Sequence, residues 1–125
     1  MSIPKLRTIT GLIVLTLAVL LTACGSDDTA AQPQAETVEI SVAQFQFQPG
    51  TIEVPVGTTI TWNNSDRILH TVTAGTPDNP TPEIFDGLLD DAGSTFSFTF
   101  TEAGTFDYYC DIHPHMVGTI TVVGA

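Results

Sequence analysis

Alternation of apolar and polar residues, which begins near Thr37, constrains the fold more than any other feature of the chain. In a β-strand, residues two apart lie on the same face, so this alternation predicts strands that are buried on one side. The clearest cases are residues 38–42 and residues 96–100, where Phe occupies every second position. No useful length of the region beyond Thr37 has the 3.6-residue period of an amphipathic helix.

Turn signals divide this region into about seven or eight short strands, which predicts an all-β, antiparallel β-sandwich. We expect a loop at residues 74–82, which contain three prolines, and the only turn of helix within residues 83–89. The chain length suits one domain, which we place at residues 37–125. The strands are expected near residues 37–42, 45–47, 52–54, 58–62, 70–73, 96–100, 105–110 and 119–123.

Residues 1–23 have the composition of an export signal, with Lys5 and Arg7 ahead of an apolar segment at residues 9–21. As a helix this segment would rise only about 20 Å, short of the roughly 30 Å of a bilayer's hydrocarbon core. The Leu-Thr-Ala-Cys sequence that ends at Cys24 resembles a bacterial lipobox, in which the cysteine is lipidated. We therefore expect a domain anchored to the cell membrane outside the cytoplasm. The alternative is an ordinary signal peptide with a chance cysteine.

Residues 25–36 contain no large apolar side chain, so we interpret residues 24–36 as a lipidated cysteine followed by a flexible tether. Twelve residues of this kind have an r.m.s. reach of roughly 20 Å. Such a tether would hold the domain near the membrane and still let it turn toward partners.

Cys110, His113 and Met116 lie within seven residues of one another, and His70 lies forty residues before Cys110. If Cys24 is lipidated, Cys110 has no disulfide partner and is better explained as a metal ligand than as a free thiol. Two imidazoles, one thiolate and a weak axial thioether select copper and suit one-electron transfer. Zinc also binds Cys and His, but a thioether is a poor ligand for it.

Residues 108–118, Tyr-Tyr-Cys-Asp-Ile-His-Pro-His-Met-Val-Gly, resemble the copper loop of small blue copper proteins, the plastocyanin/amicyanin group of cupredoxins. The two-residue gaps on either side of His113 are most similar to the short amicyanin-type loop. The resemblance implies a Greek-key β-sandwich that binds one copper ion through His70, Cys110, His113 and Met116. It also implies that the edge of His113 reaches the surface and serves as the electron port.

Four neighbours of these ligands are candidates for tuning the site or docking partners: Thr71, Ile112, Pro114 and His115. Thr71 and Ile112 replace an asparagine and a proline that are common in the family, while Pro114 stiffens the loop by fixing its backbone φ. His115 is the alternative source of an imidazole ligand. We expect it instead to point outward and titrate near neutral pH, where its charge would raise the reduction potential. An exposed histidine without a role is an equally good interpretation.

Loss of Lys5 and Arg7 with the signal changes the formal net charge from −11 to −13, since one arginine then faces fourteen acidic residues. Such a domain is not expected to bind nucleic acid, and anionic lipid surfaces would repel it. We expect a monomer that is steered toward redox proteins with a basic docking face, such as a cytochrome or oxidase domain. General acidity that keeps the protein soluble explains the charge equally well.

Together these features predict an electron carrier that cycles between Cu(I) and Cu(II). A module for copper storage or delivery would use the same ligands and is the alternative. An enzyme is not expected, because the chain's three histidines are too few for a trinuclear copper cluster. No nucleophile paired with a base and no phosphate-binding loop is visible either.

Overall fold

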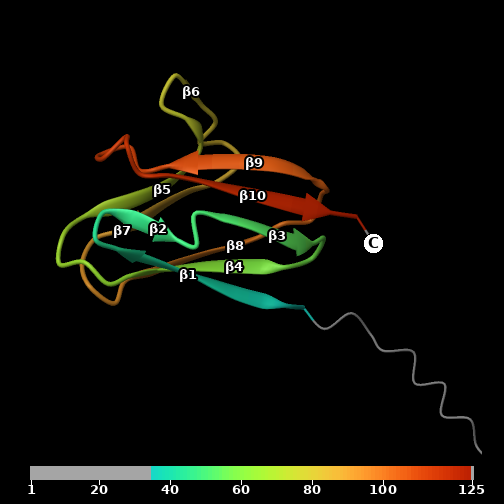
Figure 1. Cartoon of the computed structure of the whole chain (residues 1–125), viewed down its shortest axis with the longest axis horizontal. Helices are drawn as coiled ribbons and strands as arrows, with labels where there is room; N and C mark the ends of the chain where they lie inside the picture. Colours follow the sequence, from blue (N-terminus) through green and yellow to red (C-terminus); the bar gives the residue numbers. More distant parts are fainter. Residues whose placement is uncertain (1–34, 125) are drawn as a thin grey trace, which may run out of the picture. The chain divides into compact units, whose positions relative to one another are not determined.

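The computed structural model describes residues 35–124, which form a sandwich of two β-sheets (Figure 1). One sheet has the strand order β2-β1-β4-β8, with bounds β1 Thr37–Ala43, β2 Gln46–Gln48, β4 Thr59–Asn64 and β8 Thr95–Thr99. The other sheet has the strand order β3-β10-β9-β5-β6, and β7 pairs with β5. The bounds of its strands are β3 Thr51–Pro55, β5 His70–Thr76, β6 Asn79–Pro80, β7 Asp86–Leu89, β9 Gly104–Tyr109 and β10 Val117–Val123. The expected all-β sandwich is confirmed.

Both sheets are mixed, so the expectation of a purely antiparallel sandwich is wrong in this respect. Strand β1 pairs in parallel with β4, and β10 pairs in parallel with β3, while the other pairs are antiparallel. The chain crosses to the second sheet at β3 before β4 returns beside β1. Periodicity reports which face of a strand is buried but not the direction of its neighbour, so the sequence pattern could not reveal this.

Three local expectations are also corrected. The expected loop at residues 74–82 is largely a hairpin, because β5 continues to Thr76 and turns back into β6. The expected helical turn at residues 83–89 is a turn followed by β7. Phe45, expected on a strand face, lies in the tight β1–β2 turn with a φ of 59° and is exposed.

Gly87 lets β7 pack closely against the opposite sheet. A Cβ at this position would lie 2.2 Å from the ring of Phe96, so the missing side chain leaves the space that the ring fills.

Within residues 35–124 no helix is long and apolar enough to cross a membrane. The expected signal, Cys24 and most of the tether lie outside the described residues.

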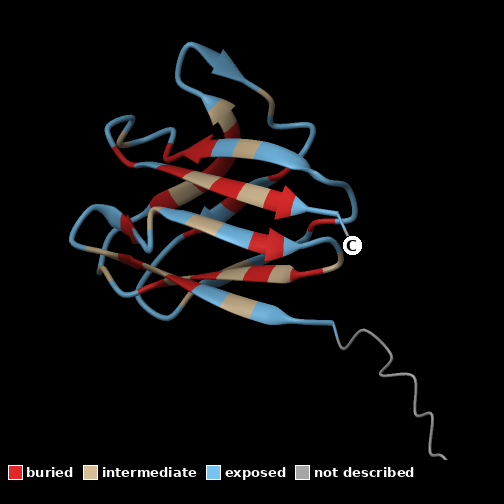
Figure 2. Ribbon diagram, turned by 45° about the vertical axis from the view of Figure 1, so that its right-hand side comes forward, coloured by how far each residue is buried: buried red, intermediate tan, exposed pale blue. Residues whose placement is uncertain are grey.

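Buried residues recur along the strands of both sheets (Figure 2). The core that they form between the sheets is rich in aromatic side chains. Trp62 is fully buried, and the rings of Phe85, Phe96 and Tyr108 lie with their centroids 5.4–5.7 Å from its own. Aromatic contacts at such distances add about 0.5–1.5 kcal/mol each to the free energy of area burial. This packing supplies the rigid frame on which the loops at the ends of the strands are mounted.

Three loops meet at one end of the sandwich, on the left of Figure 1: the β1–β2 turn, the β4–β5 loop and the β9–β10 loop. Hydrogen bonds join them. Asp66 of the β4–β5 loop accepts from the backbone of Phe45 in the first turn. The start of β5 and the end of β9 are joined by a bond from the backbone N–H of Asp111 to the hydroxyl of Thr71. The residues selected from the sequence lie at this end.

Candidate metal centre

Cys110 follows directly on β9 and is completely buried. It is a free thiol, and its sulfur accepts a hydrogen bond of 3.3 Å from the backbone N–H of Thr71. This hydrogen bond helps to hold the sulfur in place, and cysteine binds metals as the thiolate. The loop after Cys110 closes on itself, because the Cys110 N–H donates to the carbonyl of Met116 and the Met116 N–H donates to that of His113.

Two imidazoles face this sulfur. His70, the buried first residue of β5, has its Nδ1 atom 3.9 Å from Cys110 Sγ, and His113 has its Nδ1 atom 3.6 Å from the same sulfur. The three ligand atoms all lie within 4.8 Å of one another. Residues forty positions apart are thus brought into one cluster, and both imidazoles present the same nitrogen to it.

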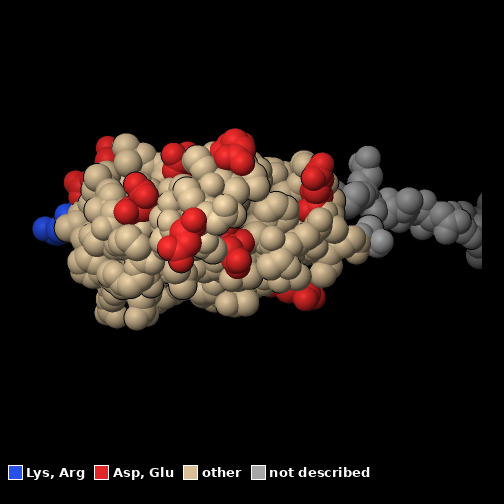
Figure 3. Space-filling view, turned by 90° about the horizontal axis from the view of Figure 1, so that it is seen from above, with Lys and Arg blue, Asp and Glu red and all other residues tan. Residues whose placement is uncertain are grey.

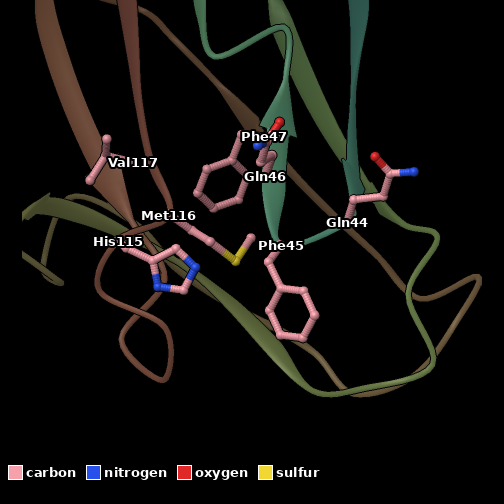
Figure 4. A pocket seen from close by; sticks show the side chains of 7 residues that line it. All are labelled: Gln44, Phe45, Gln46, Phe47, His115, Met116 and Val117. Atoms are coloured by element: carbon pink, nitrogen blue, oxygen red, sulfur yellow. The ribbon is translucent and has the colours of Figure 1, made fainter.

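Met116 lies in the same loop and is buried, with 2% of the residue's surface accessible. Figure 4 shows its thioether between Phe45 and the ring of His115. These residues line part of an open cavity of about 320 Å³ beside the centre. The cavity touches Met116 but not the three clustered ligand residues, so its lining does not define the candidate metal site. The axial role of Met116 stays a prediction.

The four neighbours named from the sequence lie around the cluster. Thr71 joins the two ligand-bearing segments, because its hydroxyl accepts from the N–H of Asp111 at 2.8 Å and lies 3.1 Å from the hydroxyl of Thr73. Ile112, Pro114 and His115 are exposed on the loop. The ring of His115 lies 6.3 Å from that of His113 and outside the ligand cluster.

Asp66 is one of two polar residues of this site that sequence reasoning missed. Its carboxylate lies 3.1 Å from Nε2 of His70 and accepts hydrogen bonds from the backbone of Gln44 and Phe45. Burial alone would raise the pKa of Asp66, but the two backbone donors and His70 lower it below its ordinary value. A carboxylate four residues before the histidine was the available signal, but a loop of unknown path gave no reason to pair them.

Asn64 was also missed, and it holds the loop that carries Asp66. It is buried, its side-chain N–H₂ donates to the carbonyls of Ile68 and Leu89, and its side-chain oxygen accepts from the N–H of Asp66. In the sequence it lies within residues 63–66, Asn-Asn-Ser-Asp, whose composition is typical of a turn and gives no sign of such a role. Its hydrogen bonds satisfy the backbone of a loop that has no strand partner.

His113 is half-buried at the surface end of the cluster. Burial lowers its pKa, and the nearby imidazoles of His70 and His115 lower it further. A neutral imidazole has a free lone pair for a metal, so the environment favours the form that binds.

Comparison with known proteins agrees with this geometry. Residues 34–123 match the family of copper binding proteins described as the plastocyanin/azurin family. Amicyanin of Paracoccus denitrificans is 33% identical over 74% of this chain and 70% of its own, and plastocyanin of Sambucus nigra is 35% identical over 61% and 86%. A structure titled as a purple cupredoxin from Nitrosopumilus maritimus superposes with a TM-score of 0.62 at 30% identity, covering 69% of this chain and 99% of that one.

The fold and the ligand cluster define a class, that of the cupredoxins. This chain belongs to the plastocyanin/azurin family of copper-binding proteins. The described residues fit a single copper ion, because a buried thiol and two imidazole nitrogens already converge at one point. The resemblance expected from residues 108–118 is therefore confirmed, and so is copper as the cofactor.

Proposed function

We propose that this protein is a membrane-anchored type 1 copper protein that shuttles single electrons between extracytoplasmic redox partners. The observation that carries the proposal is the convergence of His70 Nδ1, Cys110 Sγ and His113 Nδ1 within 4.8 Å. Copper bound by these groups supplies one-electron chemistry through its Cu(I) and Cu(II) states. Similarity to amicyanins and plastocyanins supports the same class of function.

The chain's own contribution is a site that needs little rearrangement. Cys110 is fixed by the end of β9 and by the N–H of Thr71, and His70 is fixed by burial and by Asp66. Met116 is held by backbone hydrogen bonds to both Cys110 and His113. A rigid set of ligands imposes one geometry on both oxidation states, and this reduces the reorganisation that accompanies electron transfer.

The surface near His113 supports a docking role. Exposed apolar side chains from the three loops and from the first residue of β10 lie near the ligand end: Phe45, Ile68, Leu69, Ile112 and Val117. Transient redox complexes bury little area, so a modest apolar patch around an exposed imidazole edge is sufficient. The expected basic partner is supported by the acidic surface in Figure 3, on which Arg67 is the only lysine or arginine among residues 35–124.

The location is proposed from the sequence alone. Cys24 in its lipobox-like segment would attach the domain outside the cytoplasm through residues 25–36. Replacement of Cys24 by Ser is expected to release the protein from the membrane fraction without changing its copper site. Retention of the Cys24→Ser variant in the membrane would contradict the lipid anchor.

Reversible voltammetry in the presence of a copper chelator tests the electron-transfer role. We expect repeated reduction and oxidation without loss of copper, because His70, Cys110 and Met116 are buried. Backbone hydrogen bonds hold the loop that carries His113. Rapid transfer of copper to the chelator upon reduction would contradict a carrier and would instead favour storage or delivery. A variant with Met116 replaced by Leu should still cycle, with a changed potential, since the axial ligand tunes the redox potential of such sites.

A further inference from the structure

The carboxylate of Asp66 connects three segments at the ligand end. It accepts from the N–H of Gln44 at 2.9 Å and of Phe45 at 3.1 Å, and it lies 3.1 Å from Nε2 of His70. The two backbone donors belong to the β1–β2 turn, while His70 begins β5. Asp66 is itself held by Asn64, whose side-chain oxygen accepts from its N–H at 2.9 Å.

This contact assigns the proton on the His70 ring. An ionised carboxylate only accepts hydrogen bonds, so the nitrogen that faces it must carry the hydrogen. Nε2 is therefore protonated in the neutral ring, and Nδ1 keeps its lone pair. Nδ1 is the atom that faces the sulfur of Cys110 at 3.9 Å. The form of His70 that can bind a metal is thus selected before any metal arrives.

The same carboxylate also holds the turn that places the ring of Phe45 beside His70 and His113. Gln44 and Phe45 have φ values of 54° and 59°, a left-handed conformation that is unfavourable for residues other than glycine. Both of their N–H groups donate to Asp66 in this conformation. The ring of Phe45 then meets His70 and His113 edge-on, with centroids 5.7 Å and 5.1 Å away.

We propose that Asp66 is a positioning residue of the copper centre. It fixes the Nε2–H tautomer and the orientation of His70. Its hydrogen bonds also hold the β1–β2 turn in the conformation in which the ring of Phe45 contacts both imidazoles. Partners of this kind raise the basicity of a ligating imidazole, and their loss typically weakens metal binding by about 10- to 100-fold. The inference rests on the proposed role of His70 as a ligand, yet its first readout requires no copper.

The test compares the purified protein with its Asp66→Asn variant. Each oxygen of Asp66 accepts from a backbone N–H, so either orientation of an amide would set its N–H₂ against a donor. Nitrogen-15 NMR of the metal-free wild type is expected to show His70 as the Nε2–H tautomer, and the variant should lose this preference. The variant should also bind Cu(II) about 10- to 100-fold more weakly and have a higher reduction potential.

Glu102→Gln is the matched control, because it removes an exposed carboxylate just before β9, whereas Cys110 follows the other end of that strand. Glu102→Gln should change neither the tautomer of His70 nor the affinity for Cu(II). Asp66→Glu keeps a carboxylate, so both properties should be closer to those of the wild type than in Asp66→Asn. An Nδ1–H tautomer in the metal-free wild type would overturn the proposal even if the variant does not fold. So would an Asp66→Asn protein whose affinity and potential match those of Glu102→Gln. Failure of the loaded wild type to cycle would contradict only the electron-transfer role.

Discussion

Around Trp62 the interior is filled with aromatic rings, whereas around Cys110 it is ordered by hydrogen bonds. Two of the polar atoms beside Trp62, its own Nε1 and the hydroxyl of Tyr108, are buried without a partner. At the ligand end Asn64, Asp66 and Thr71 each make at least two hydrogen bonds. Among the described residues, no side-chain atom of the ligand loops is buried and unsatisfied.

The core around Trp62 must supply stability, whereas the ligand end around Cys110 must also fix the orientation of each metal ligand. Apolar packing is strong but not directional, so the core gains stability and tolerates an unpaired hydroxyl or indole N–H. Metal ligands need one orientation each, which directional hydrogen bonds supply. Substitutions in the core should therefore lower the free energy of unfolding, while substitutions at the ligand end should mainly change the copper site.

The largest effect is expected for Trp62→Ala. Removing a fully buried indole leaves a cavity and should lower the free energy of unfolding by about 3–5 kcal/mol. Urea unfolding of the metal-free protein measures this. Thr61→Ala, on the opposite face of β4, is the control and should cost far less. If the folded Trp62→Ala protein also lost its copper spectrum, the core around Trp62 and the ligand end would not act independently of each other.

The free energy of unfolding should fall at alkaline pH because Tyr108 is buried. Burial raises the pKa of Tyr108 from 10.0 to about 12, and this effect outweighs the opposing influence of the nearby Trp62 side chain. Above pH 10 the unfolded chain releases this proton before the folded one does, so stability falls as the pH rises from 10 to 12. The loss approaches about 2–3 kcal/mol.

Denaturant unfolding of Tyr108→Phe, at about pH 9 and about pH 11.5, checks this expectation. The variant should lack most of the alkaline loss. At neutral pH it should be nearly as stable as the wild type, because the hydroxyl has no partner to lose. An unchanged alkaline loss in the variant would show that the core hydroxyl is not its source.

Thr71→Val should have a smaller effect on stability and a clear effect on the site. Valine keeps the shape but removes the acceptor for the Asp111 N–H, which costs about 1 kcal/mol. Because this bond joins the His70 segment to the Cys110 segment, the visible spectrum of the copper-loaded protein should shift. Thr73→Val, whose hydroxyl bonds to Thr71 and Asp86, is the neighbouring control and should shift the spectrum less.

The smallest effect concerns His113. Its lowered pKa means that, below its ordinary value of 6.5, the unfolded chain takes up a proton that the folded protein resists. The stability of the metal-free protein should therefore decline as the pH falls through that range. His113→Gln should remove this part of the decline in urea unfolding curves. A decline of equal size in the variant would assign the effect to other groups.

Much of the fold was readable from the sequence, because one-sided burial leaves a period-two pattern that is visible at residues 38–42 and 96–100. Strand direction and the β5–β6 hairpin were not readable from the sequence. Periodicity does not record which strands are neighbours, and Pro77 in the hairpin turn and Pro80 in β6 are typical of a loop. The ligand residues could be proposed because Cys110, His113 and Met116 share one loop. Asp66 could not, because its role depends on how two distant turns meet.

A titration of the metal-free protein with Cu(II), followed by visible absorption and EPR, tests whether the chain forms one mononuclear copper site with a thiolate ligand. We expect an intense thiolate-to-copper band that saturates at one equivalent of copper, with the EPR signal of a single mononuclear site. The band should be absent from Cys110→Ser and retained in His115→Phe. Uptake of Cu(II) by the wild type without this band, or the same band in Cys110→Ser, would contradict a type 1 copper site at Cys110.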